Sequence, residues 1–244
     1  MLIWLASYPR SGNTLSRLVL EREFGYPTCS LYREPGAEDI PEIADLVDLT
    51  SVDVVARAID MDADIHFVKT HELATDDAFP AIYVVRDGRD AMVSFAHFLI
   101  DFEIGNNGHD PNVHYWQTLQ ELITTTQPYG GWSQNAQSWL HRPGTVLVKF
   151  EELIGQPVEA IRKALRELQV EPRTTKGGRG ERFVSFEQLH RESPHFYRTG
   201  ASGTWRTDMD DLLEQLFWQE HGGTMDALGY PRTPAQAPLH PVHG

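Results

Sequence analysis

The amino-acid sequence predicts an α/β fold, a single domain built on a central, mostly parallel sheet that is flanked by helices. Short apolar runs alternate with segments of helical periodicity, which is the order of strands and crossover helices. Several of these runs end in charged loops, where parallel sheets bind their ligands. The 244 residues, 41% of them hydrophobic, suffice for one sizeable core. We expect a domain at residues 1–230 and a poorly ordered tail at 231–244, which is rich in Pro, His and Ala.

The first strand is predicted at Leu2 to Ala6, a continuous apolar run. It ends in the loop from Ser7 to Asn13, whose turn residues cannot continue a strand. A helix follows, because the apolar residues from Leu15 to Val19 recur at helical spacing, and Gly25 ends it. The chain therefore opens with a strand, a loop similar to a phosphate-binding P-loop, and a helix.

The later elements follow from the same periodicities. Buried strands are predicted at 65–68 and 81–85, and each runs into a charged segment, at 69–71 and 86–90. The remaining predictions are surface helices within the acidic segment 34–64, helices at 90–102, 113–126, 133–140, 158–168 and 210–220, a strand at 145–150 and a mobile loop at 174–182.

The composition excludes some classes of function. The 35 Asp and Glu residues against 21 Lys and Arg residues give a formal charge of −14, which repels polyanions, so we expect no nucleic-acid partner. The apolar start of the chain is too short for a membrane span and lacks the basic leader of a signal peptide. Cys29 is the only cysteine, so no intrachain disulfide can form, and we expect a cytoplasmic location.

The loop after the first strand is suited to a phosphate-like anion. Gly12 allows the backbone to approach the ligand closely, the free N–H groups at the helix start point at it, and Arg10 adds charge and forked donors. The loop lacks the Gly to Gly-Lys-Ser/Thr span of a Walker A motif. An ordinary helix N-cap after a turn is the alternative interpretation.

Five segments in chain order carry a resemblance to a known family. They are residues 4–14, 69–71, 83–94, 148–153 and 197–206. In turn they resemble the 5′-phosphosulfate loop, the catalytic strand end, the 3′-phosphate segment, a strand end before a helix and the late Gly-rich loop of the cytosolic-type sulfotransferases. Those enzymes use 3′-phosphoadenosine 5′-phosphosulfate (PAPS) as sulfuryl donor. The resemblance spans about residues 1–230, nearly the whole chain.

The resemblance implies two groups of residues for the two anionic centres of PAPS. For the phosphosulfate end it implies Arg10, Ser11, Gly12, Asn13 and Thr14. For the 3′-phosphate it implies Arg86, Ser94 and the loop residues Arg198, Thr199 and Gly200. Without the resemblance, surface ion pairs for the two arginines and an ordinary helix serine would be the simpler interpretation.

Three positions depart from the family's pattern. Leu15 stands where the family typically has a tryptophan that stacks on the adenine, so we expect that other side chains, Trp205 or Phe150, hold the base beside Leu15, or that the base is held less tightly. Thr199 replaces a usual lysine and removes one cation from the 3′-phosphate site. Arg10 also replaces a lysine, and its guanidinium can donate hydrogen bonds but is a poor acid.

The resemblance and the chemistry together predict a general base. Sulfuryl transfer passes in line between two oxygens, so positioning and charge stabilisation dominate and no metal is required. His71 is the predicted base, and Lys69 and Arg10 are predicted to stabilise charge on the transferring group. A strand-end histidine bound to a backbone carbonyl is the alternative. Zinc is not expected, because the sequence has no His-Glu-x-x-His pattern and Cys29 has no cysteine partner.

The predicted function is transfer of a sulfuryl group from PAPS to a hydroxyl or amine of a small-molecule acceptor. The acceptor's identity and the oligomeric state stay open. Two other functions remain as alternatives: a nucleotide-dependent kinase with a similar strand, loop and helix, and a protein that binds PAPS or its product without turnover.

Overall fold

The computed structural model describes residues 1–26, 28–32, 65–101, 111–172 and 202–232. The predictions for the segment 34–64, the loop 174–182, Arg198, Thr199, Gly200 and all but the first two residues of the tail lie outside these ranges.

A five-stranded parallel sheet forms the centre of the fold, in the order β2-β3-β1-β4-β5. The strands are β1 (Leu2–Ser7), β2 (Thr28–Ser30), β3 (His66–Thr70), β4 (Ala81–Val85) and β5 (Thr145–Lys149). The central strand β1 pairs with β3 on one side and β4 on the other, and all of its residues are buried. This burial on both faces explains why β1 is a continuous apolar run, and the predicted α/β class is confirmed.

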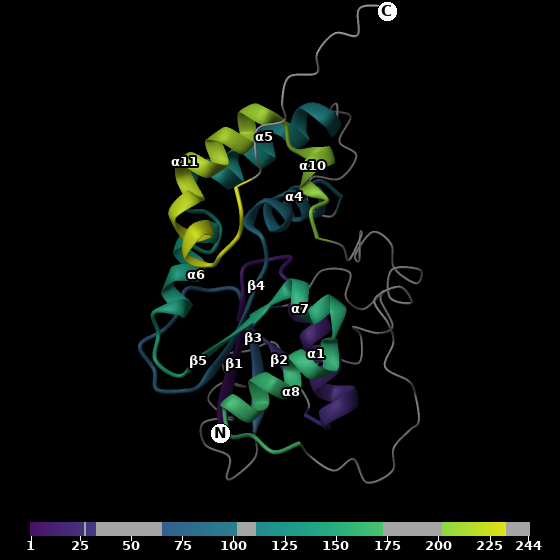
Figure 1. Cartoon of the computed structure of the whole chain (residues 1–244), viewed down its shortest axis with the longest axis vertical. Helices are drawn as coiled ribbons and strands as arrows, with labels where there is room; N and C mark the ends of the chain where they lie inside the picture. The colour runs from purple at the N-terminus through teal and green to yellow at the C-terminus, as the bar shows by residue number, and fades with distance from the viewer. Residues whose placement is uncertain (27, 33–64, 102–110, 173–201, 233–244) are drawn as a thin grey trace, which may run out of the picture.

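Helices cover both faces of the sheet (Figure 1). They are α1 (Asn13–Phe24), α4 (Gly88–Leu99), α5 (Pro111–Thr124), α6 (Gly131–Leu140), α7 (Phe150–Gly155), α8 (Pro157–Glu167), α10 (Trp205–Asp208) and α11 (Asp211–Ala227). Helices α1 and α8 pack on one face, whereas α4, α5, α6 and α11 share a cluster with the other. Figure 1 shows α4, α5, α10 and α11 gathered beyond the carboxyl end of the strands.

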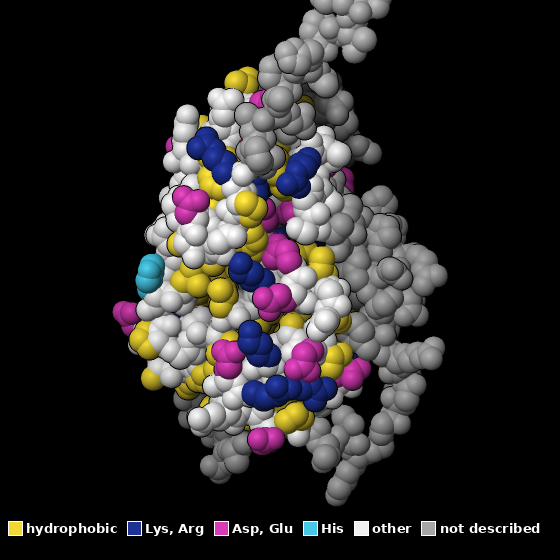
Figure 2. All heavy atoms as spheres, viewed as in Figure 1, with side chains coloured by type: hydrophobic (Ala, Val, Ile, Leu, Met, Phe, Trp, Pro, Cys, Tyr) yellow, Lys and Arg dark blue, Asp and Glu magenta, His cyan; other side chains and the backbone are white. Residues whose placement is uncertain are grey.

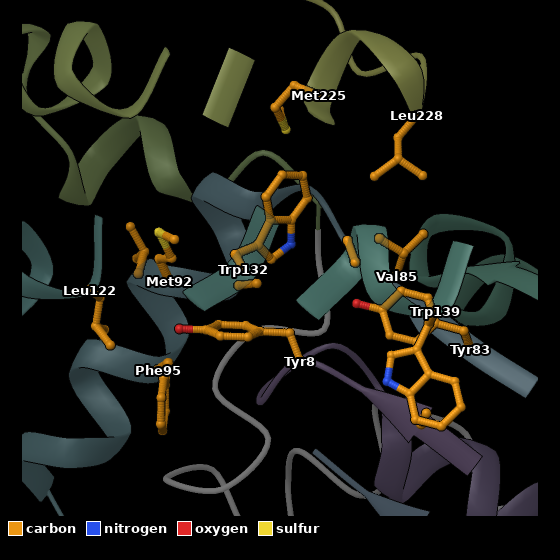
Figure 3. Packing of buried hydrophobic residues seen from close by; sticks show 14 of the residues in the cluster. Tyr8, Tyr83, Val85, Met92, Phe95, Leu122, Trp132, Trp139, Met225 and Leu228 are labelled. Atoms are coloured by element: carbon orange, nitrogen blue, oxygen red, sulfur yellow. The ribbon is translucent and has the colours of Figure 1, made fainter. Parts of the chain in front are cut away.

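The side chains of β1 alternate between two hydrophobic clusters. Ile3 and Leu5 point to the cluster under α1 and α8, whereas Trp4 and Ala6 point to the cluster under the other helices. Figure 3 shows part of this second cluster, where large aromatic side chains fill the space between sheet and helices. The cores therefore hold the carboxyl end of β1 rigidly from both sides.

Most elements lie where the sequence predicts them, with three informative differences. The predicted helix 210–220 continues to Ala227, because Gly222 is buried in the helix interior and does not end it. The predicted strand 145–150 ends at Lys149, and Phe150 begins α7. Helix α4 begins at Gly88, since the Asp87 side chain accepts the backbone N–H of Arg89 at 3.0 Å and caps the helix.

The surface around α8 carries both signs of charge. Figure 2 shows Lys and Arg side chains next to Asp and Glu side chains over this face. Within α8, Arg162 and Arg166 both form ion pairs with Glu159, at 3.2 and 2.9 Å. None of the described helices combines the length and the apolar character that crossing a membrane requires.

Candidate active site

The loop between β1 and α1 turns sharply at the carboxyl end of the central strand. Arg10 and Gly12 both have a left-handed backbone conformation, with φ of 63° and 100°. No side chain caps α1, so the first backbone N–H groups of the helix can donate to a ligand that binds at the loop. The Oγ of Ser11 is buried and has no hydrogen-bond partner among the described residues. The loop thus offers backbone N–H groups and a hydroxyl to an anion.

Gly12 is the position in this loop that tolerates no side chain. A Cβ here would lie 2.7 Å from Cδ2 of Phe150, and the left-handed backbone already disfavours any other residue. We expect Gly12→Ala to lower the free energy of unfolding by about 1–3 kcal/mol, as measured by denaturant unfolding. Gly155→Ala is the control, because its Cβ would meet nothing within 4 Å. An equal loss in both variants would contradict this explanation.

The three residues that follow Gly12 take different positions. The Nδ2 of buried Asn13 donates to the carbonyl of Leu5 at 2.8 Å and to Oγ of Ser7 at 3.3 Å, which ties the start of α1 to β1. Thr14 is partly exposed in the first turn of the helix. Leu15 is buried in the hydrophobic cluster under α1. The predicted contacts of these three side chains with the donor stay predictions.

The residues predicted for the two anionic centres of the donor contact one another. Nε of Arg10 donates to Oγ of Ser94 in α4 at 3.3 Å. A terminal nitrogen of Arg86, which directly follows β4, donates to the carbonyl of Arg10 at 3.1 Å. The Arg86 guanidinium also lies 4.3 Å from the centre of the Phe150 ring. Three stretches of chain that are distant in sequence, around residues 10, 86–94 and 150, therefore place two guanidinium groups, a hydroxyl and an aromatic ring side by side.

The two aromatic residues predicted for the adenine differ in their surroundings. Phe150 lies beside Arg86 and Gly12, within the group just described. Trp205 is buried at the start of α10, and its ring lies 4.1 Å from the guanidinium of Arg89. Of the two, Phe150 is thus the ring next to the predicted cationic side chains.

Lys69 is buried at the end of β3 in a cationic environment. Burial lowers the pKa of the Lys69 ammonium well below its usual value, and the nearby guanidinium groups of Arg17 and Arg10 lower it further. An anion bound at the loop would therefore lie in the positive electrostatic potential of three basic side chains, Lys69 from β3, Arg17 from α1 and Arg10 from the loop itself.

His71, the residue after Lys69 and Thr70, has one ring nitrogen bound and the other open. Its Nδ1 lies 2.7 Å from the backbone carbonyl of Ser7, which can only accept, so Nδ1 carries the proton. Its Nε2 has no hydrogen-bond partner among the described residues and holds the lone pair. Burial lowers the pKa of His71 well below 6.5, and the charge of Lys69 lowers it further. The imidazole is thus neutral, with an accepting nitrogen available.

Four further residues of this site were not found from the sequence. Arg17 is fully buried in α1, with Nε donating to Oγ1 of Thr28 at 3.0 Å. A basic residue between the apolar positions of this helix was a signal that could have identified it. The others are Tyr32, Tyr129 and Asn135, which surround His71. They come from loops and from a distant helix, and no local pattern marks them.

Comparisons with a family model, with curated proteins and with solved structures all identify sulfotransferases. Residues 2–221 match the family model described as "Sulfotransferase domain". The chain is 21% identical over 260 residues to Sulfotransferase 1A1 of Canis lupus familiaris, covering 92% of this chain and 83% of that protein. It is 24% identical over 247 residues to Flavonol 3-sulfotransferase of Flaveria bidentis, covering 88% and 78%. The fold is similar to that of mouse sulfotransferase SULT7A1 complexed with PAP, with a TM-score of 0.64, 18% identity and coverage of 91% and 84%.

Proposed function

The chain belongs to the sulfotransferase family and is a PAPS-dependent sulfotransferase, and from that premise we propose how its residues carry out the transfer. Arg10 and its loop hold the phosphosulfate, Arg86 and Ser94 hold the 3′-phosphate, and His71 removes the proton of the acceptor. The observation that carries this proposal is the convergence of Arg10, Ser94 and Arg86, which hydrogen bonds join across 84 and 76 residues of sequence.

The donor carries two anionic groups, the 5′-phosphosulfate and the 3′-phosphate, which lie on opposite sides of the ribose. We propose that the loop N–H groups and Ser11 receive the phosphosulfate oxygens, since Ser11 is buried beside them with its hydroxyl unbound among the described residues. Arg86 is oriented by the carbonyl of Arg10 and by the ring of Phe150. The adenine is proposed to lie against Phe150, which takes over from the tryptophan that Leu15 replaces.

The reaction is a single in-line displacement. The acceptor's O–H or N–H proton moves to Nε2 of His71 while the acceptor atom forms a bond to sulfur. The bond from sulfur to the bridging phosphate oxygen breaks, and 3′-phosphoadenosine 5′-phosphate (PAP) leaves with the electron pair. Lys69, Arg10 and Arg17 supply positive charge for the oxygens that become more negative. In the described part of the chain, no three His, Cys, Asp or Glu side chains come together as a metal site would require.

The acceptor is proposed to be a small molecule with a hydroxyl or amine group, and the name of one relative, Flavonol 3-sulfotransferase, supports a hydroxyl of a small molecule. A cytoplasmic location is proposed on the basis of the single cysteine. The direct test is release of PAP from PAPS in the presence of panels of phenols, flavonols, aliphatic alcohols and amines. PAP release that requires an acceptor supports the proposal, whereas tight PAP binding without release by any acceptor class would favour a protein without turnover.

The pH dependence of the reaction follows from the low pKa of His71. The base must be neutral, and burial together with the charges of Lys69 and Arg10 disfavours its protonation. We therefore expect kcat/KM for PAPS to stay level as the pH falls through 6.5 and to drop only at lower pH. Steady-state rates between pH 5 and 8 measure this. A drop centred at or above pH 6.5 would contradict the expected environment of His71.

A further inference from the structure

The backbone of His71 is held by side chains instead of by the sheet. Strand β3 ends at Thr70, so the peptide groups of His71 lie beyond the ladder of backbone hydrogen bonds. Its N–H donates to the phenol oxygen of Tyr32 at 2.9 Å, and its carbonyl accepts from Nδ2 of Asn135 at 2.7 Å. Tyr32 lies two residues after β2, and Asn135 is in α6. The position of His71 thus depends on two residues from other parts of the chain.

Tyr32 also contacts the imidazole ring. The two rings are stacked, with centroids 5.5 Å apart and an angle of 20° between their planes. Tyr129 contacts the same ring at 5.6 Å and approaches Tyr32 at 6.0 Å. Among the described residues, Tyr32 therefore holds the backbone N–H of His71 and covers its ring at the same time.

The phenol oxygen of Tyr32 is itself fixed. It donates to Oε1 of Glu72 at 3.1 Å and lies 3.5 Å from Oγ1 of Thr70. Burial raises the pKa of Tyr32 to about 12, so the phenol stays neutral and keeps its proton for Glu72. With its proton directed to Glu72, the oxygen presents a lone pair to the N–H of His71. The bond to Glu72 and the bond from the N–H of His71 can therefore exist at the same time, with the phenol as donor in the first and acceptor in the second.

We propose that Tyr32 is a positioning residue for sulfuryl transfer, which aims Nε2 of His71 at the acceptor and shields the imidazole from water. The inference rests on the proposed role of His71 as base. The carbonyl of Ser7 fixes the proton on Nδ1, but one hydrogen bond leaves the ring free to tilt about it. The stacked phenol and the bond to the backbone N–H remove that freedom.

Several charged or titratable groups face His71 and must be considered together. Lys69 comes from β3, Arg10 from the loop, Arg17 from α1 and Tyr129 from the segment before α6, and Glu72, the next residue in the chain, accepts the phenol proton of Tyr32. The charges of Lys69, Arg10 and Arg17 lower the pKa of His71, and we expect their effect to persist when Tyr32 is replaced, because none of them belongs to Tyr32. Burial is the largest cause of the low pKa of His71, and removal of the Tyr32 ring is expected to reduce this burial.

The first experiment measures His71 directly by NMR titration of its imidazole in the full chain. In Tyr32→Leu we expect the pKa of His71 to rise towards 6.5, because water reaches the ring. In Tyr32→Phe the ring stays, so we expect a small change in this pKa. Tyr26→Leu and Tyr26→Phe are matched controls, since Tyr26 is also buried, bonds a carbonyl through its hydroxyl and packs on Phe67. An unchanged pKa in folded Tyr32→Leu overturns the shielding.

The second experiment measures turnover. We expect Tyr32→Phe to lower kcat roughly tenfold with little change in KM for PAPS, because the base is misdirected while the donor site is intact. A purely structural role would lower the melting temperature and leave kcat of the folded protein unchanged, which overturns the inference. His71→Ala separates this inference from the proposed function. If that variant is inactive while Tyr32→Phe has normal kcat, the positioning role fails and the base stands; if His71→Ala retains kcat, the base itself fails.

Discussion

Replacing His71 with alanine is expected to lower kcat by about 10²–10⁴-fold, the usual contribution of a positioned general base. The accepting Nε2, which has no hydrogen-bond partner among the described residues, is lost, and the alanine side chain offers no group that could take the proton of the acceptor. Binding of PAP is expected to survive, because the hydrogen bonds between Arg10, Ser94 and Arg86 do not involve the imidazole. Single-turnover rates and calorimetric binding of PAP measure the two effects separately.

The matched control for this variant is His141→Ala. His141 also bonds a backbone carbonyl through Nδ1, that of Gln137, but it lies exposed at the end of α6. We expect its kcat and PAP affinity to equal those of the unmodified chain. Near-normal turnover in His71→Ala would rule out the base, and His71 would then be a strand-end histidine bound to the carbonyl of Ser7 with no part in the transfer.

The second large effect is a loss of PAP affinity when Arg86, proposed to bind the 3′-phosphate, is replaced. Arg86→Gln retains a donor but loses the charge, so PAP binding should weaken by about 1.5–3 kcal/mol, roughly 10- to 150-fold. Adenosine 5′-phosphate, which lacks the 3′-phosphate, should bind the variant and the unmodified chain with similar affinity. Calorimetric titrations of the variant and of the unmodified chain with each nucleotide measure whether affinity is lost for PAP alone.

Arg162→Gln is the control for the removal of one guanidinium. Arg162 lies 5.3 Å from the ring of Phe24, much as Arg86 lies near Phe150, but it is on the surface of α8. Its removal should leave both nucleotide affinities unchanged. If Arg86→Gln weakens both nucleotides equally, Arg86 acts through the carbonyl of Arg10 and not on the 3′-phosphate.

The strands and the charged segments at their ends could be predicted from the sequence for a physical reason. A strand buried on both faces must be a continuous apolar run, and β4 at 81–85 has the bounds that its run predicts. Since parallel strands end at the same edge, Lys69 at the end of β3, His71 just after it and Arg86 after β4 had to lie on either side of the loop after β1.

Other features could not be predicted because tertiary contacts decide them. Strand β2 is three residues long, too short for any periodicity to appear. Asn135 looks like an ordinary polar helix residue, yet it is fully buried and binds both the carbonyl of His71 and the phenol of Tyr83. The ring of Trp205 packs against the guanidinium of Arg89. This contact depends on the packing of α10 against α4, which no local sequence pattern predicts.

The central place of β1 has a practical consequence. Because β3 lies on one side of it and β4 on the other, His71, proposed to act on the acceptor, and Arg86, proposed to bind the 3′-phosphate, follow different strands of the sheet. Directed evolution of substrate preference can therefore begin around His71, with libraries that leave Arg86 and Ser94 unchanged. Affinity for the donor would then serve as an internal check that each redesigned enzyme is still assembled correctly.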